Sequence, residues 1–206
     1  MTQKGLLLVV SGPSGVGKGT ICSKLMSERD NIKMSVSVTT RQPRPGETEG
    51  VSYFFRTEEE FMKMVEADAF LEYMCVFGKN HYGTPKSYVE EQRNAGYDVI
   101  LEIDVKGALK VKEKCDDAVM IFIAPPDMDT LRNRLVGRGT ETPESVARRF
   151  GEAIKEIGLA EQYDYIIVND NLDKAVGQVQ SVISAEHSRV INNSELINQL
   201  KEKCKS

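Results

Sequence analysis

A glycine-rich segment that ends in a lysine, Gly12–Thr20, is the part of the sequence best suited to chemistry. Glycines let a backbone wrap around an anion, and Lys18 supplies a charge that can reach the β- and γ-phosphates of a nucleotide. The spacing Gly12-x4-Gly17-Lys18 directly follows the apolar run Leu6–Val10. A strand, a glycine-rich turn and a helix that opens at a lysine predict a nucleoside triphosphate site rather than a plain turn. The expected contacts are Gly12, Pro13, Ser14, Gly15, Val16, Gly17, Lys18, Gly19 and Thr20.

Position 19 departs from this pattern, because it is glycine where a magnesium-binding Ser or Thr is usual. We therefore expect Mg²⁺ to be held mainly by phosphates and waters, with Thr20 and Glu102 as candidates for its water shell. Glu102 and Asp104 close the apolar run Val99–Ile103 at its carboxyl end, where metal-associated acids lie in such folds. The alternative for the two acids is an edge carboxylate and a helix N-cap.

A second anion site is predicted by Arg41 and Arg44, which lie three residues apart in a proline-bounded segment. Two neighbouring guanidinium groups repel each other unless an anion lies between them, and a phosphate accepts bidentate pairs from both. Taken alone, the segment could equally be a solvated basic turn. Together with a triphosphate loop, it favours a second phosphate site.

Other polar groups interrupt apolar surroundings further along the chain. Glu72 stands within the apolar run Phe70–Met74, so we expect it to face a polar ligand or solvent. Tyr82 and Thr84 place a phenol and a hydroxyl in the next segment. His81 and His187 have no partner at metal-ligand spacing, and we interpret both as structural or surface residues.

The polar segment 137–143 contains two glycines and has the composition of a mobile lid. A lid over a triphosphate needs cations to offset the charge of the group in transfer, so at least two flanking arginines should point inward. The arginines in question are Arg132, Arg134, Arg138, Arg148 and Arg149.

These groups must be positioned by strands and helices. Apolar runs at 6–10, 34–38, 99–103, 119–123 and 166–168 read as buried strands, and helical patterns cover 128–135 and 172–183. Strands alternating with helices predict an α/β fold, a parallel-sheet core with helices on both faces and ligands at the carboxyl ends of its strands.

The interval 35–84 breaks this alternation. It holds short aromatic strands at 53–55 and 70–73 and a helix introduced by the capping-box pattern Thr57-x-x-Glu60. We interpret it as a small, mainly antiparallel insertion of mixed α/β structure. The predicted division is a core of residues 1–34 and 85–206, with a lid at about 137–149, and an insertion at 35–84.

Composition narrows the functional classes. The chain has 206 residues, 40% of them hydrophobic, which suits one sizeable domain. A net charge of −4 argues against nonspecific nucleic-acid binding, and no apolar run is long enough to suggest a membrane segment. Four scattered cysteines without a C-x-x-C pair fit reduced thiols. A soluble, cytoplasmic protein is expected.

With these residues assembled, the chain resembles a guanylate kinase. The matching segments run in family order across nearly the whole chain: 12–20, Ser35–Glu47, Tyr53, Phe70–Glu72, Tyr82–Thr84, Ile100–Gly107, Phe122–Pro126, Gly137–Thr142 and Ile167–Asp170. The resemblance implies a phosphate-loop core, an insertion that binds a nucleoside monophosphate, and a lid. It also implies Mg²⁺-assisted transfer of a phosphoryl group from ATP to GMP or dGMP, giving ADP and GDP, in purine nucleotide metabolism.

The resemblance also assigns roles to residues. Arg41, Arg44, Tyr53 and Tyr82 would hold the phosphate of GMP, and Ser37, Glu72, Thr84 and Asp104 would read its guanine. The loop at 12–20 would hold ATP, and Arg134, Arg138 and Arg149 would act from the lid side. The implied catalytic set is Lys18, Arg41, Arg134, Arg138 and Arg149.

Two rival functions remain at this point. Guanylate-kinase-like domains also serve as catalytically silent interaction modules, but such a module could dispense with the glycine loop and Lys18, which are intact here. A phosphate-loop kinase for another small acceptor is the second rival, and the presence of Glu72, Arg41 and Arg44 argues against it.

Overall fold

A five-stranded parallel sheet forms the centre of the computed structural model, which describes residues 3–76, 78–136 and 143–203. The strands are β1 (Leu7–Ser11), β2 (Ile32–Met34), β7 (Asp98–Glu102), β8 (Ala118–Ala124) and β9 (Tyr165–Val168), in the order β2-β7-β1-β8-β9. Every residue of β1 and β8 is buried, because continuous apolar runs suit strands that are covered on both faces. The predicted fold class is confirmed.

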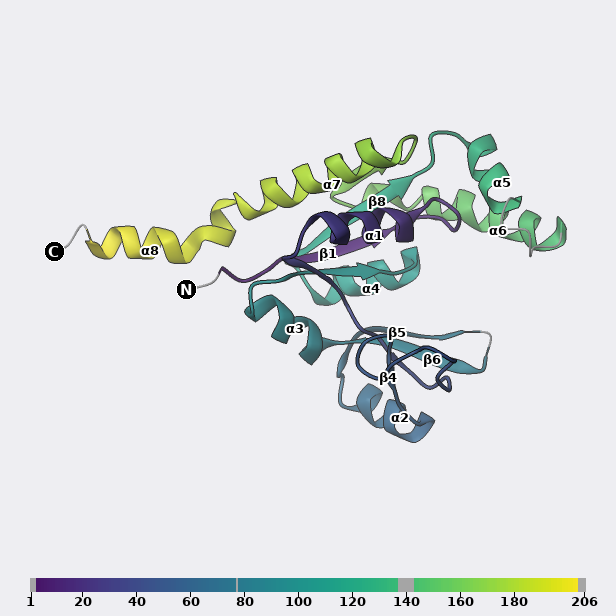
Figure 1. Ribbon diagram of the computed structural model, residues 1–206, viewed down its shortest axis with the longest axis horizontal. Helices are drawn as coiled ribbons and strands as arrows, with labels where there is room; N and C mark the ends of the chain where they lie inside the picture. Colours follow the sequence, from purple (N-terminus) through teal and green to yellow (C-terminus); the bar gives the residue numbers. More distant parts are fainter. Residues whose placement is uncertain (1–2, 77, 137–142, 204–206) are drawn as a thin grey trace.

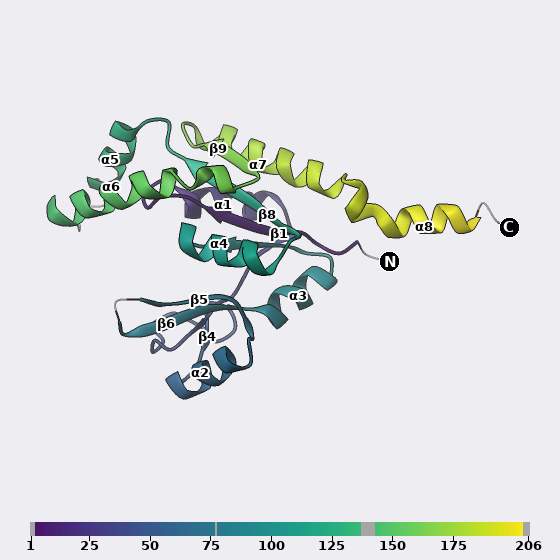
Figure 2. The same cartoon turned by 180° about the vertical axis from the view of Figure 1, so that it is seen from behind.

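Helices cover both faces of this sheet (Figures 1 and 2). On one face, α1 (Lys18–Glu28) and α7 (Leu172–His187) bury Ile21, Leu25 and Val179 against the strands. On the other face, α3 (Lys86–Asn94) and α4 (Val105–Lys114) contribute Val89 and Val111. Two further helices, α5 (Met128–Val136) and most of α6 (Pro143–Ile157), also pack against the first face, while the last residue of α6 packs against β8 on the other face.

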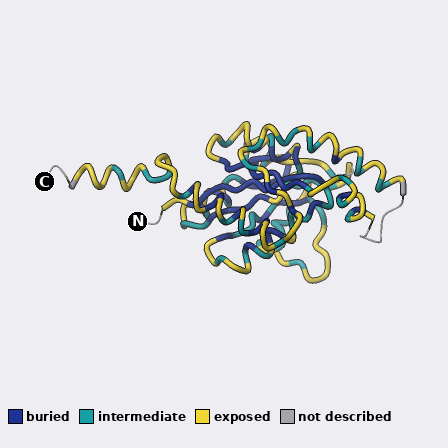
Figure 3. The backbone as a smooth tube through the Cα atoms, turned by 90° about the horizontal axis from the view of Figure 1, so that it is seen from above, coloured by how far each residue is buried: buried dark blue, intermediate teal, exposed yellow. Residues whose placement is uncertain are grey.

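The C-terminal segment leaves this body. After α7 come the 3₁₀ helix η2 (Val190–Asn193) and α8 (Ser194–Lys203), which extends away from the sheet (Figure 1) and is largely exposed (Figure 3). Another 3₁₀ helix, η1 (Ala160–Gln162), precedes β9. Among the described helices, none is both long and apolar enough to cross a membrane.

A second, four-stranded sheet lies beside the first (Figure 2). Its order is β4 (Phe54–Phe55), β3 (Val38–Thr39), β6 (Asn80–Pro85), β5 (Phe70–Val76). One helix, α2 (Glu58–Glu66), begins with the expected capping box: Thr57 and Glu60 satisfy each other's backbone N–H groups. The stacked rings of Phe61 and Phe70, 4.6 Å apart, give this sheet a small core of its own.

One detail of the expected organisation is wrong. The single strand expected at 34–38 is two strands in different sheets, because β2 ends at Met34 and β3 begins at Val38. Ser35 still donates its N–H to the Ile100 carbonyl (2.9 Å) before the chain crosses over. A serine side chain is costly to bury in a sheet that is covered on both faces. The polar segment Ser35–Ser37 therefore suits a connection between the two sheets better than a continuous buried strand. The second sheet is mainly antiparallel, as expected, because β6 pairs antiparallel with both β3 and β5, while the short β3–β4 pair is parallel.

Candidate active site

The loop between β1 and α1 has the geometry of an anion site. Gly12, Gly15 and Gly17 have φ angles of 141°, 85° and 96°, a region that residues with side chains rarely adopt. At Gly12 a Cβ atom would lie 2.2 Å from the Ile123 carbonyl oxygen, so the loop also needs glycine for its approach to β8. The N–H groups of Gly17, Lys18 and Gly19 donate to no described residue. Free N–H groups at a helix N-terminus attract anions.

Lys18, the first residue of α1, lies folded over this loop. Its Nζ donates to the carbonyl oxygens of Gly12 (2.6 Å) and Pro13 (3.3 Å). Burial lowers the pKa of Lys18, whereas the nearby carboxylates of Glu102, Glu156 and Asp104 act in the opposite direction. The ammonium group is thus already at the loop where a phosphate would bind.

The residues beside the loop fit a magnesium ion. Glu102 ends β7, and its Oε1 lies 3.3 Å from where a Cβ atom at Gly19 would be. That contact puts the carboxylate against the first turn of α1. Thr20 is exposed next to it. Mg²⁺ is commonly held by one carboxylate with phosphates and waters, so no cluster of three protein ligands is required, and the described residues form none.

A second cationic site surrounds Arg41. Its guanidinium group pairs with Glu47 (Nη2 to Oε1, 2.7 Å) and donates from Nε to the Tyr82 hydroxyl (3.3 Å). The same group lies 5.4 Å from the centre of the Tyr53 ring. The hydrogen bond from Arg41 lowers the pKa of Glu47, and the bond to Glu47 raises that of Arg41. Three of the four residues expected at the GMP phosphate are therefore together.

Arg44 differs from the other three. It is exposed, and its backbone N–H, rather than its side chain, donates to Glu47 Oε2 (2.8 Å). Glu47 thus ties Arg41 and the Arg44 backbone into one turn. Glu47 is a site residue without a predicted role, although an acid three residues after Arg44 is a usable signal in the sequence.

Two carboxylates meet where β5 of the second sheet lies against the first turn of α4. Glu72 on β5 is 6% exposed and accepts a hydrogen bond from the Thr84 hydroxyl (2.7 Å). Asp104 is the N-cap of α4, where its Oδ1 accepts from the Gly107 N–H (2.7 Å). A Cβ atom at Gly107 would lie 3.3 Å from Asp104 and 3.4 Å from Glu72, so the carboxylates converge on this glycine. Burial, with the nearby charge of Asp104, raises the pKa of Glu72.

A cavity of about 200 Å³, called the groove below, opens beside Thr84, the hydrogen-bond partner of Glu72. It is lined by Ser37, Tyr53 and Thr84 from the second sheet and its links, and by Glu102 from the end of β7. The cavity therefore extends from Ser37 and Thr84, which are expected to read guanine, to Glu102, which is expected near magnesium. Glu72, expected to face a ligand or solvent, is buried and hydrogen-bonded near this cavity.

Two lid-side arginines reach the phosphate loop. Arg134 on α5 donates to the carbonyl oxygens of Asn169 (2.9 Å) and Val16 (3.4 Å). Arg149 on α6 donates to the Ser14 hydroxyl (3.3 Å). By contrast, Arg132 lies over the Phe150 ring and Arg148 is exposed. Arg138 and the rest of 137–142 lie outside the described residues.

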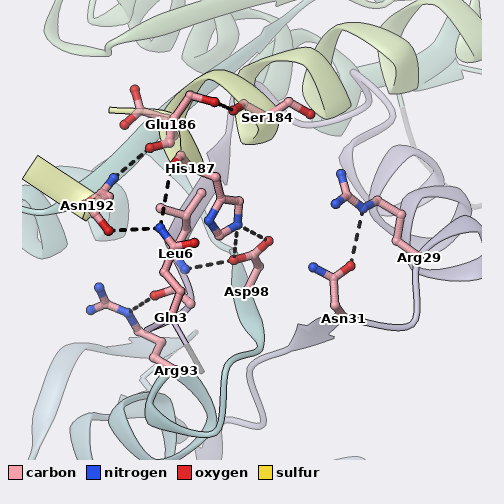
Figure 4. Close-up of polar contacts among 12 residues, drawn as sticks. Gln3, Leu6, Arg29, Asn31, Arg93, Asp98, Ser184, Glu186, His187 and Asn192 are labelled. Atoms are coloured by element: carbon pink, nitrogen blue, oxygen red, sulfur yellow. Dashed lines mark hydrogen bonds and ion pairs between the residues drawn. The ribbon is translucent and has the colours of Figure 1, made fainter. Parts of the chain in front are cut away.

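The two histidines lie in structural settings. His81 packs against Phe61, with ring centres 5.3 Å apart. His187 pairs with the buried Asp98 (2.9 Å), which also accepts from the Leu6 N–H (Figure 4). This network joins the end of α7 to the amino ends of β1 and β7, whereas the phosphate loop leaves the carboxyl end of β1.

A parallel sheet whose first strand leads into a phosphate loop, with a second cationic site on an adjoining sheet, defines a phosphate-loop kinase that acts on a phosphorylated acceptor. Residues 4–186 match the family model described as guanylate kinase. The chain belongs to the guanylate kinase family.

Curated relatives agree over almost the full length. The chain is 50% identical to a guanylate kinase of Caldanaerobacter subterraneus subsp. tengcongensis over 97% of both chains. It is 52% identical to one of Clostridium perfringens, covering 97% of this chain and 92% of that protein. The crystal structure of guanylate kinase from Anaplasma phagocytophilum superposes with a TM-score of 0.69 at 36% identity, covering 92% of this chain and 89% of that one.

Proposed function

We propose that the loop Gly12–Thr20 binds ATP and the groove beside Glu72 binds GMP, in the guanylate kinase reaction that converts ATP and GMP to ADP and GDP. Membership of the family supports the reaction, and the geometry of the site supports the residue roles. GMP and dGMP differ only at the ribose, where no assigned residue acts, so both are proposed as acceptors.

The convergence of Glu72, Asp104 and the Thr84 hydroxyl is the observation that carries the choice of base. Guanine presents N1–H and the 2-amino group as adjacent donors, which a carboxylate can accept together. The Thr84 hydroxyl holds Glu72 Oε1, and Oε2 faces Gly107 beside Asp104. Adenine has an acceptor at N1, so the carboxylate would keep its bond from Thr84 but gain none from N1 of the base, which is costly in a buried site.

The chemistry requires alignment and charge neutralisation more than proton transfer. The phosphate of GMP is already an anionic nucleophile, so no strong general base is needed. Arg41, Tyr53 and Tyr82 hold that phosphate, with Arg44 joining from its exposed position. Lys18 stabilises the negative charge on the phosphoryl group during its transfer.

Arg134 and Arg149 contribute positive charge from α5 and α6, next to the loop they already contact. Arg138 is proposed from the family resemblance alone. Lid closure would exclude water, since ATP hydrolysis is the side reaction to suppress.

Magnesium is proposed as the metal that accompanies ATP. Glu102 and Thr20 would hold it through its waters, and it would supply charge neutralisation between the phosphates.

The division of the chain into a core (1–34 and 85–206) and a GMP-binding insertion (35–84) is likewise a proposal. Its support is that all four strands of the second sheet lie between Val38 and Pro85 and pack around their own small core.

Partners and location follow from the same features. The proposed substrates are small molecules, with neither nucleic acid nor membrane as a partner. A cytoplasmic location is supported by Cys22, Cys75 and Cys115, which are free thiols in the structure.

The test is an assay of ADP release across GMP, dGMP, AMP, CMP and UMP. We expect efficient turnover with GMP and dGMP, and very poor turnover with AMP. ADP release without any monophosphate preference would favour a kinase for another acceptor, and no turnover in folded, ATP-binding protein would favour a silent interaction module.

A further inference from the structure

Asn169 is a buried polar residue that the proposed chemistry leaves without a role. It follows β9, is 7% exposed, and donates from Nδ2 to the Val16 carbonyl oxygen at 2.8 Å, across 153 positions of sequence. Its own backbone is fixed on both sides: its N–H donates to Ala124 (2.8 Å), and its carbonyl accepts from Arg134 (2.9 Å). The side chain is therefore held rigidly against the phosphate loop.

The contact extends to the next residue of the loop. A Cβ atom at Gly17 would lie 2.5 Å from Asn169 Nδ2, so the amide packs directly on the Gly17 backbone. In a planar trans peptide the C=O and N–H groups point in opposite directions. Because the Val16 C=O points at Asn169, the N–H of Gly17 points away from it. That N–H donates to no described residue.

We infer that Asn169 is a positioning residue for the phosphate loop: by holding the Val16 carbonyl, it keeps the Gly17 N–H aimed at the phosphates of ATP. The inference rests on the proposed function, in that the loop is taken to bind ATP. Arg134 braces the arrangement, because it bonds both the Asn169 carbonyl and, at 3.4 Å, the Val16 carbonyl. A loop fixed before the ligand arrives loses less freedom on binding.

Two variants test this, each measured by calorimetric titration with ATP, tripolyphosphate and GMP, and by thermal unfolding. Asn169→Ala removes the hydrogen bond, and we expect about tenfold weaker binding of both ATP and tripolyphosphate. Asn169→Asp sets a carboxylate against the Val16 carbonyl, and we expect about a 100-fold loss for both. The affinity for GMP should stay within about twofold in each variant.

Asn171→Ala is the matched control. Asn171 lies two residues away and caps α7 by accepting from the Lys174 N–H (3.1 Å), without contacting the loop. It should lower the unfolding temperature and leave tripolyphosphate binding unchanged.

Tripolyphosphate separates the possible outcomes, since it carries the phosphates without the nucleoside. Loss of ATP affinity with unchanged tripolyphosphate affinity would place Asn169 at the nucleoside and overturn the inference. Equal losses for ATP and GMP, matched by Asn171→Ala, would reduce Asn169 to a structural role. If the unaltered protein bound neither ATP nor tripolyphosphate, the proposed function would fail together with the inference. If it bound both and the variants did too, the inference alone would fail.

Discussion

Lys18 is the residue on which phosphoryl transfer depends most directly. Its ammonium group lies against the phosphate loop and donates a hydrogen bond to the Gly12 carbonyl. The carboxylates of Glu102, Glu156 and Asp104 are near enough to favour its positive charge. Lys18→Ala should keep the fold, because the side chain fills no apolar core, and should lower kcat by about 100- to 1000-fold. The control is Lys24→Ala on the exposed side of α1, where Lys24 pairs with Asp173. Near-normal turnover of a folded Lys18→Ala protein would refute the role.

Glu72 is the residue that should decide the choice of base. Glu72→Gln keeps the size but replaces one acceptor oxygen with a donor, and one charge-assisted hydrogen bond is worth about 1.5–3 kcal/mol. We expect at least about a tenfold loss of kcat/KM for GMP. Glu66→Gln, at the exposed end of α2, is the control. Steady-state kinetics with the unaltered protein should also show AMP to be very poor; AMP within about tenfold of GMP would mean that Glu72 does not read the base.

The raised pKa of Glu72 adds a dependence on pH. Desolvation favours the protonated form, which cannot accept from both guanine donors. As the pH falls toward this raised pKa, the carboxylate is neutralised and the KM for GMP should rise, while the KM for ATP changes less. The folded protein also holds this proton more tightly than the unfolded chain, so Glu72 favours folding at low pH and this contribution is lost as the pH rises through the folded pKa. A KM for GMP that rises equally on acidification in Glu72→Gln would assign the titration to another group.

At the scale of elements, the turn that follows β3 organises the second cationic site. Arg41→Ala removes the group that pairs with Glu47 and bonds Tyr82, and should weaken GMP binding by about 1.5–3 kcal/mol with little effect on ATP. Arg44→Ala should act in the same direction, although its side chain is exposed. Titration of each nucleotide measures this. Arg56→Ala is the control, since Arg56 makes a similar pair with Glu49 (2.8 Å). A loss of affinity for ATP rather than for GMP would mean that the two nucleotides are assigned to the wrong sites.

The elements also show what sequence could and could not predict. The loop, the buried strands and the capped helix α2 rest on local signals: glycine spacing, apolar runs and the Thr57–Glu60 pair. The crossing at Ser35–Ser37 was missed, because a run of alternating residues does not reveal which sheet each end joins. The contact of Asn169 with Val16 was also missed, since it spans 153 positions and no local pattern encodes it.

At the scale of the whole molecule, the two sheets share little apolar surface. The second sheet packs mainly around Val38, Phe61 and Phe70. Among the described residues, Leu71 is the one buried residue of this sheet that belongs to a hydrophobic cluster of the central sheet. Because residues of both sheets and their links line the groove, a ligand that bonds to both sheets should draw them together.

Small-angle scattering with and without a bisubstrate analogue that joins ATP to GMP tests this closure. The radius of gyration should fall when the analogue binds, because the second sheet and the predicted lid at 137–149 move toward the central sheet. ATP alone should give a smaller change, since it contacts only the loop side of the groove. A second measurement, on a chain truncated before α8, removes the extended C-terminal helix from the average. An unchanged radius in both proteins, with binding confirmed by titration, would mean that the site is already closed without ligand.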